Sequence, residues 1–508
     1  MFNKHPKGLI PAALANMGER FGFYTMMAIL LLFLQAKFGL SGTDAGIIYS
    51  VFYSLIYILA LAGGVIADKT KSFKGTILAG LVVMALGYLM VAVPTPTPVP
   101  TDSYTFYLIL TCLGLFVIAF GNGLFKGNLQ ALVGQMYDND QYRSMRDSGF
   151  SLFYMFINVG AIFAPFMASG VRDWWVERNG FAYNADLPSI CHSMLDGTIT
   201  PEAKERLSTL AAEVSGGATV SDLSAFATEY LSVFVTGFHY AFGTAIGAML
   251  ISLAVYIINK KNFPDPSAKK VESAADAAEV PAMDVAEVRQ RLYALFAVFA
   301  VVIFFWFSFH QNGLTLTLFA KEYTDLNLFG MEITPELFQS LNPFFVVFLT
   351  PLVMAIFAWQ QRRGVEPSTP KKIALGMGIA AAAYVVMTVW SNMANLPLHS
   401  EVLAAGGSDV LVSPMLLLIT YFILTIAELY ISPLGISFVS RVAPPQYQGI
   451  MQGCWLGATA LGNQLLFIGA ILYESIPIWI TWSVFVGACL ISMFMMLFML
   501  KWLERIAK

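Results

Sequence analysis

The sequence predicts an all-α membrane protein whose chain crosses the bilayer about twelve times. Of its 508 residues, 57% are hydrophobic and only 12% are charged, which is about half the charged fraction of an ordinary soluble protein. Apolar runs of about 20 residues recur along the whole chain, and each is long enough to span the hydrocarbon core as a helix. The four cysteines lie at no short spacing from one another, so they indicate neither a disulfide framework nor a metal site.

The distribution of positive charge predicts the orientation of the chain. An even number of helices places both termini on one side, and Lys and Arg are concentrated in the loops on that side. Because positive loops are cytoplasmic, we expect a multi-pass plasma (inner) membrane protein with both termini in the cytoplasm. The predicted helices run near 9–36, 45–67, 74–93, 104–136, 147–171, 232–259, 291–320, 336–360, 372–393, 413–439, 449–472 and 478–502.

A polar segment divides these helices into two halves. We expect an N-terminal six-helix bundle over 1–259, a cytoplasmic linker over 260–290 and a C-terminal six-helix bundle over 291–508. An extracytoplasmic insertion over 172–231 interrupts the first half. Within it, TPEAKERLSTLAAEV has a Thr cap, a proline in the first turn and apolar residues at helical spacing, which predicts a small helical cap without transport chemistry.

Twelve helices in two six-helix halves are typical of the major facilitator superfamily, whose transporters bind their solute near the bilayer midplane between the halves. GGVIADKTK, Gly63–Lys71, fits the short loop that follows the second helix in that superfamily. Its glycines permit close helix contact, and Asp68 is expected at the cytoplasmic mouth. The sequence therefore predicts a major facilitator fold.

Four charged residues and one histidine are predicted to lie deep in the membrane: Glu19 and Arg20 in the first helix, Lys126 in the fourth, His310 in the seventh and Glu428 in the tenth. A charge at the bilayer centre costs about 2.5–3.5 kcal/mol, so such residues usually pair and mark a solute or proton pathway. Two acids and two bases sum to zero, as expected of a paired network. An inert ion pair that joins helices is the alternative interpretation.

Several motifs carry a resemblance to a known family. GERFGFY, Gly18–Tyr24, resembles the second half of a helix-one motif, ExxERFxYY. GNGLFKGN, Gly121–Asn128, resembles a helix-four segment with a characteristic lysine, and FYMFINVGA, Phe153–Ala161, matches the helix-five signature FYxxINxG. AELYISPLG, Ala427–Gly435, is similar to a helix-ten segment. Together with LNPFF and MQGCWLG in the eighth and eleventh helices, these motifs resemble the proton-dependent oligopeptide transporters, also called the peptide transporter family.

The resemblance implies a di- or tripeptide site between the halves. A zwitterionic peptide requires an anion for its ammonium group and cations for its carboxylate. The family candidate for the ammonium is Glu428, and those for the carboxylate are Arg20 and Lys126. Holding both ends favours closure of one half onto the other, which couples binding to alternating access. The other family pocket positions match Tyr24, Tyr57, Asn158, Asn342 and Trp455, for which helix packing is the alternative.

Three positions depart from the family pattern. Asn16 stands where the helix-one motif begins with a glutamate, Met27 where the family usually has an arginine, and His310, in FHQNG, where it has an acid. In the family this arginine and this acid are thought to pair as an outer gate. Losing both avoids an unpaired buried charge, which would cost several kcal/mol. For proton coupling the resemblance leaves Glu19, with Lys126 as its family partner, together with Arg20 and His310.

We therefore expect a secondary active transporter that imports di- and tripeptides by proton symport with alternating access. The sequence contains no nucleotide loop, metal spacing or nucleophile–base set, so we expect no enzyme, cofactor or metal, and no nucleic-acid partner. The expected partners are the peptide, protons and the lipid bilayer, and the expected functional unit is a monomer. A facilitator of another small zwitterionic solute and a non-transporting nutrient receptor are the alternatives.

Overall fold

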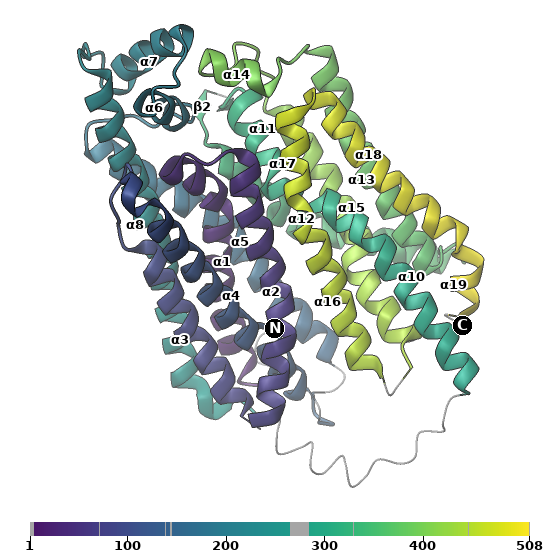
Figure 1. The fold of residues 1–508 in the computed structure, drawn as a ribbon. Helices are drawn as coiled ribbons and strands as arrows, with labels where there is room; N and C mark the ends of the chain where they lie inside the picture. The colour runs from purple at the N-terminus through teal and green to yellow at the C-terminus, as the bar shows by residue number, and fades with distance from the viewer. Residues whose placement is uncertain are drawn as a thin grey trace. The chain divides into compact units, whose positions relative to one another are not determined.

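The structure is a computed structural model, and it describes residues 5–70, 72–137, 139–142, 145–264, 284–328, 330–444 and 447–506. Within these residues, twelve helical segments are long and apolar enough to cross a membrane (Figure 1). This confirms the predicted all-α polytopic fold. The chain separates into two compact units, one of residues 1–277 with Val402–Gly407 and the other of residues 278–401 and 408–508. Most of the linker expected at 260–290 lies outside the described residues.

In its described residues, the first unit contains six helical segments that are long and apolar enough to span a membrane, and several short helices. α4 packs against both α2 and α3, while α1 packs along α5 and α8. Only glycine permits the approach of α2 to α4, because a Cβ on Gly63 would collide with the carbonyl of Gly123. The elements are α1 (Leu9–Phe38), α2 (Gly42–Thr70), α3 (Phe73–Ala92), η2 (Thr101–Ser103), α4 (Tyr104–Gln135), α5 (Arg146–Arg178), α6 (Leu187–Leu195), α7 (Pro201–Val214), α8 (Leu223–Asn259) and η4 (Lys260–Asn262).

The insertion of the first unit forms two short helices, α6 and α7, near one end of α8 (Figure 1). α7 is the helix predicted from the Thr cap: Thr200 Oγ1 accepts a hydrogen bond of 3.1 Å from the amide of Ala203. Arg172, near the end of α5, contacts the start of the insertion through Tyr183. Its fully buried guanidinium lies 4.2 Å from the centre of the Tyr183 ring, and its Nε donates to Asp173 Oδ1 at 2.8 Å.

In the second unit, two of the predicted helices are broken, which the hydropathy pattern did not indicate. The seventh runs as α10 (Val285–Phe309), η5 (His310–Gly313) and α11 (Thr315–Tyr323). The eleventh runs as α16 (Gln448–Gln464) and α17 (Leu466–Ser475). The other elements are β1 (Asn327–Leu328), β2 (Met331–Glu332), η6 (Pro335–Ser340), α12 (Leu341–Arg362), α13 (Thr369–Met393), α14 (His399–Ala405), α15 (Met415–Val442), α18 (Ile478–Phe498) and α19 (Leu500–Ile506).

Candidate functional site

In the first unit, Glu19 and Arg20 form a buried ion pair on α1. Arg20 Nε donates to Glu19 Oε2 at 2.5 Å, and Arg20 Nη2 donates to Glu19 Oε1 at 2.6 Å. A third donor comes from α4, where Asn122 Nδ2 bonds Glu19 Oε1. Glu19 is 0% exposed and Arg20 is 5% exposed. A buried pair is tolerated only when further hydrogen bonds satisfy its remaining lone pairs, and Asn122 supplies one of them.

Lys126 lies one helical turn beyond Asn122 on α4, and its partner is an aromatic ring of α2. Lys126 Nζ is 4.6 Å from the centre of the Tyr57 ring, a cation–π geometry. Arg20 makes the corresponding contact with Phe23, also at 4.6 Å. Arg20 and Lys126, the two predicted site cations of this unit, are therefore each placed against an aromatic ring.

The direct bonds of Glu19 in the structure are to Arg20 and Asn122. The family resemblance implies Lys126 as its partner in proton coupling, and that role stays a prediction. The arginine takes both carboxylate oxygens because it is the neighbouring residue and its guanidinium matches a carboxylate with two parallel bonds. Asn122 was not predicted from the sequence. Its spacing of four residues from Lys126, which places both on one face of α4, is the signal that identifies it.

The remaining predicted residues of the first unit lie on α1, α2 and α5. Tyr24 is half-buried and packs edge-on against Phe23, with ring centres 5.2 Å apart. Asn158 is 8% exposed, and its Nδ2 donates to the carbonyl of Tyr154 one turn earlier. Asn16, at the position of the family glutamate, is buried, and its Nδ2 has no hydrogen-bond partner among the residues that the structure describes.

In the second unit, Glu428 and Asn342, two of the predicted substrate-site residues, are hydrogen-bonded to each other. Asn342 Nδ2, on α12, donates to Glu428 Oε2 on α15 at 2.8 Å and to Thr425 Oγ1 at 3.1 Å. The Thr425 hydroxyl donates to the carbonyl of Tyr421 at 2.7 Å, so it is free to accept from the amide. Asn342 thus orients the carboxylate of Glu428 while leaving the other carboxylate oxygen for a further donor. Thr425 was missed from the sequence, although it precedes Glu428 by one turn.

Trp455, on α16, is buried against α10 and α15 of the second unit. It is 3% exposed, and the centre of its ring lies 6.3 Å from that of Phe299. Its indole covers Gly435, two residues after the proline inside α15, where any Cβ would collide with the ring. Gly435 of the helix-ten motif is therefore required for the close approach of α15 and α16.

His310 lies at the break in the seventh helix and contacts the break in the eleventh. His310 Nδ1 is 2.5 Å from Asn463 Oδ1, and its ring stacks on Trp306 with centres 4.9 Å apart. The next residue, Gln311, donates to the carbonyl of Leu466 at 3.2 Å. The two broken helices are thus bonded to each other at their irregular turns, where helices leave backbone groups for side chains to satisfy.

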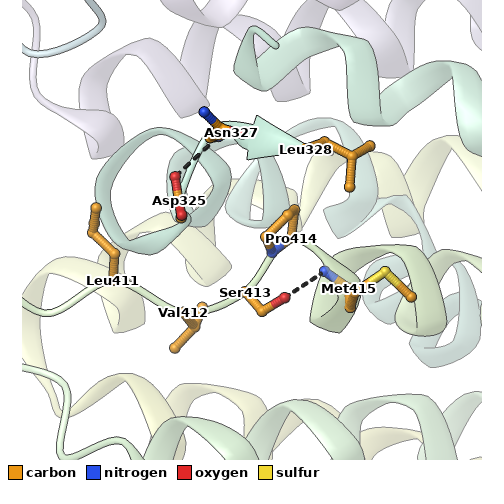
Figure 2. A pocket seen from close by; sticks show the side chains of 8 residues that line it. All are labelled: Asp325, Asn327, Leu328, Leu411, Val412, Ser413, Pro414 and Met415. Carbon is orange, nitrogen blue, oxygen red and sulfur yellow. Dashed lines mark hydrogen bonds between the residues drawn. The ribbon is translucent and has the colours of Figure 1, made fainter. Parts of the chain in front are cut away.

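A cavity of about 350 Å³ lies elsewhere in the second unit, between β1 and the segment that leads into α15 (Figure 2). Its walls include Asp325, whose Oδ1 accepts from the amide of Asn327, and Ser413, whose Oγ accepts from the amide of Met415. None of the predicted site residues lines it. Over the described part of the chain, no three His, Cys, Asp or Glu residues are grouped so as to hold a metal ion.

Comparison with protein families places residues 74–271 and 266–479 in matches to the model of the POT family. Among curated proteins, the chain is 30% identical over 490 residues to "Peptide transporter YePEPT" of Yersinia enterocolitica subsp. palearctica, covering 91% of this chain and 87% of that protein. It is 28% identical over 454 residues to "Dipeptide and tripeptide permease A" of Chromobacterium violaceum, covering 88% and 81%.

Solved structures share the fold. A crystal structure of peptide transporter POT in complex with sulfate superimposes with a TM-score of 0.72 at 22% identity, covering 99% of this chain and 96% of that one. A POT family transporter in complex with 5-aminolevulinic acid gives a TM-score of 0.72 at 20% identity, covering 99% and 97%. At these identities the likeness concerns the fold.

Proposed function

The chain belongs to the POT family, and we propose that it imports di- and tripeptides by proton symport with alternating access. Membership of this transporter family confirms the resemblance drawn from the motifs and identifies the chain as a transporter rather than an enzyme. The observation that carries the substrate class is the pair of separate clusters of opposite charge. One contains two cations, Arg20 and Lys126, and the single acid Glu19, so it carries a net positive charge when all three are ionised, and the other contains the acid Glu428.

The acid suits a peptide's ammonium group. Glu428 is half-buried and is held by Asn342, a neutral donor. No lysine or arginine of the described residues forms an ion pair with it. A carboxylate held in this way gains a charge-assisted hydrogen bond when an ammonium group arrives, whereas it would repel a simple anion. Asn342 belongs to the same proposed subsite, because it sets the direction of that carboxylate, and Trp455 forms part of its wall.

The cations suit the peptide's carboxylate, and they differ in availability. Both oxygens of Glu19 already engage Arg20, whereas Lys126 Nζ lies over the half-buried ring of Tyr57 and forms no ion pair within the described residues. We propose that Lys126 binds the carboxylate first, with Tyr57, Tyr24 and Asn158 around it. Arg20 joins when Glu19 is protonated, because a neutral acid no longer competes for the guanidinium.

This arrangement supplies the proposed coupling. A proton on Glu19 weakens its bonds to Arg20 and frees a cation for the peptide, so that proton and peptide favour the same state. His310 contacts Asn463 at the helix breaks, and we propose that it acts in gating. Its imidazole is then a second group that can bind a proton. The positions of Lys and Arg support cytoplasmic termini. We further propose that residues 260–290 form a cytoplasmic linker that connects the two halves in sequence and that the monomer is the functional unit.

The deciding experiment is uptake of labelled dipeptide into proteoliposomes, with and without an inward proton gradient. Glu428→Gln should reduce the affinity for dipeptides by tenfold or more, as expected when a charge-assisted bond worth about 1.5–3 kcal/mol is lost. Affinity for analogues that lack the amine should change little. Glu332→Gln, at an exposed residue of β2, is the matched control and should leave both affinities unchanged.

Equal losses for dipeptides and for analogues without the amine would exclude Glu428 as the ammonium partner. Wild-type protein that equilibrates peptide but never accumulates it under any proton gradient would be a facilitator. Binding without any uptake would identify a nutrient receptor.

A further inference from the structure

A cluster of titratable side chains lies in the second unit, apart from the residues assigned to the substrate. It joins Glu322 in the last turn of α11 to His399, the first residue of α14, and to Tyr473 and Glu474 at the end of α17. α11 ends the seventh span, α14 follows the ninth, and α17 ends the eleventh. After an odd number of crossings, all three lie on the side of the membrane opposite the termini.

The imidazole of His399 lies between two carboxylates. Its Nδ1 donates to Glu322 Oε2 at 3.0 Å, and its Nε2 is 3.8 Å from Glu474 Oε1. The Tyr473 hydroxyl donates to the same Glu322 oxygen at 2.9 Å. Because Nδ1 carries the proton that Glu322 accepts, Nε2 is unprotonated in the neutral ring. The attraction to Glu474 is complete only when Nε2 is protonated as well.

The cluster is shielded but remains within reach of water. The side chains of His399, Glu322 and Glu474 are 11%, 8% and 17% exposed. Two further charged residues lie near the imidazole. Lys321 on α11 is half-buried and opposes a positive charge on the imidazole, while Glu401 on α14 accepts a hydrogen bond from the amide of Leu398 at 2.8 Å. Two acids therefore face one imidazole.

We propose that His399, Glu322 and Glu474 form a proton-binding site in which the bound proton fastens the start of α14 to the ends of α11 and α17. The proton adds to Nε2 of His399, while the bond from Nδ1 to Glu322 is kept. The inference does not depend on which solute is transported.

The sign of the pH dependence follows from the surroundings of His399. Burial lowers its pKa, but the hydrogen bond and charge of Glu322 and the charge of Glu474 raise it by more, against a small opposing effect of Lys321. The pKa therefore lies above the ordinary value of 6.5. A raised folded-state pKa stabilises the fold fully below the unfolded value, and this stabilisation is lost as the pH rises through the folded-state pKa.

The test is thermal unfolding of the purified full chain between about pH 6 and about pH 9, spanning the titration range of a histidine. His399→Gln should lower the melting temperature by a few degrees more at the acidic end than at the alkaline end, where only the hydrogen bond from Nδ1 to Glu322 is lost. His5→Gln, at a buried histidine whose partner is the Tyr137 hydroxyl at 2.9 Å, is the matched control and should not show this pattern. A difference between wild type and His399→Gln that is constant with pH, or absent throughout, would overturn the proposal.

A second measurement holds even where His399→Gln does not fold. In histidine-labelled wild-type protein, one of the imidazole signals should titrate with a midpoint above that of a free histidine, which is about 6.5. Glu474→Gln, which removes a charge from the edge of the cluster and no hydrogen bond to His399, should lower that midpoint. If no signal has a raised midpoint, or Glu474→Gln leaves it unchanged, His399 is not held as an imidazolium between these acids.

Discussion

Replacing Glu19 with glutamine tests the buried pair and the proposed coupling together. The substitution keeps the shape of the side chain and one oxygen acceptor but removes the charge. The three donor bonds from Arg20 and Asn122 then face one oxygen and one NH₂ group, so at least one donor loses its acceptor. Removing one partner of a buried ion pair costs about 3–5 kcal/mol, because the remaining charge is left uncompensated.

We therefore expect Glu19→Gln to lower the apparent melting temperature clearly and to abolish uphill uptake. A gradient of about one pH unit is worth about 1.4 kcal/mol per proton, enough for about tenfold accumulation of peptide with one proton per cycle. The variant should lose this accumulation in proteoliposomes. Peptide binding and counterflow should persist, because exchange requires no net proton movement.

Two comparisons make the result decisive. Glu287→Gln removes an i,i+4 pair with Arg291 whose glutamate is 48% exposed, so its cost should stay below about 0.5 kcal/mol. His310→Asn should shift the pH optimum or slow gating without eliminating accumulation. If Glu19→Gln still concentrates peptide while His310→Asn does not, the proton site lies at the helix breaks. If Glu19→Gln is as stable as Glu287→Gln, the buried pair contributes little and the reasoning about it is wrong.

Two further predictions concern the substrate ends and the packing around them. Lys126→Ala should weaken binding of free dipeptides by about tenfold or more but weaken C-terminally amidated peptides much less, measured by competition for uptake; equal losses would remove Lys126 from the carboxylate site. Gly435→Ala should destabilise the second unit by about 1–3 kcal/mol, because the new methyl group collides with Trp455. Gly457→Ala on α16, where a Cβ would meet nothing within 4 Å, is its control. Equal melting temperatures for the two variants would contradict this packing.

The membrane helices and the motif residues were predictable from the sequence because each rests on local information. A span of about 20 apolar residues is recognisable without its neighbours, and the structure has spans at all twelve expected places. Asn342 and Glu428 were each singled out by short motifs that resemble those of a known family, but their hydrogen bond to each other was not predicted. The Thr-capped helix of the insertion was readable from Thr200 and the proline after it.

Other features were not predictable, since they depend on how helices are rotated and how closely they approach. Hydropathy does not distinguish a continuous span from a broken one. The break at η5 is short, and apolar residues continue on both sides of it, in α10 and α11. The role of Asn122 depends on the glycine contact between α2 and α4 and on the position of α4 beside α1.

The sequence alone determined that this chain is a twelve-helix transporter with acids and bases inside the membrane. Burying polar groups in hydrocarbon is costly, so membrane spans are recognisable as apolar runs and the few charged residues within them stand out. Only the tertiary structure decided which charges pair. Glu19 is bonded directly to the adjacent Arg20 and to the side-chain amide of Asn122 on α4, and not to Lys126. His399 met Glu322 from 77 residues away in the chain. Pairing energies depend on distances of a few ångströms between side chains, and those distances are set by helix packing and not by any local pattern of residues.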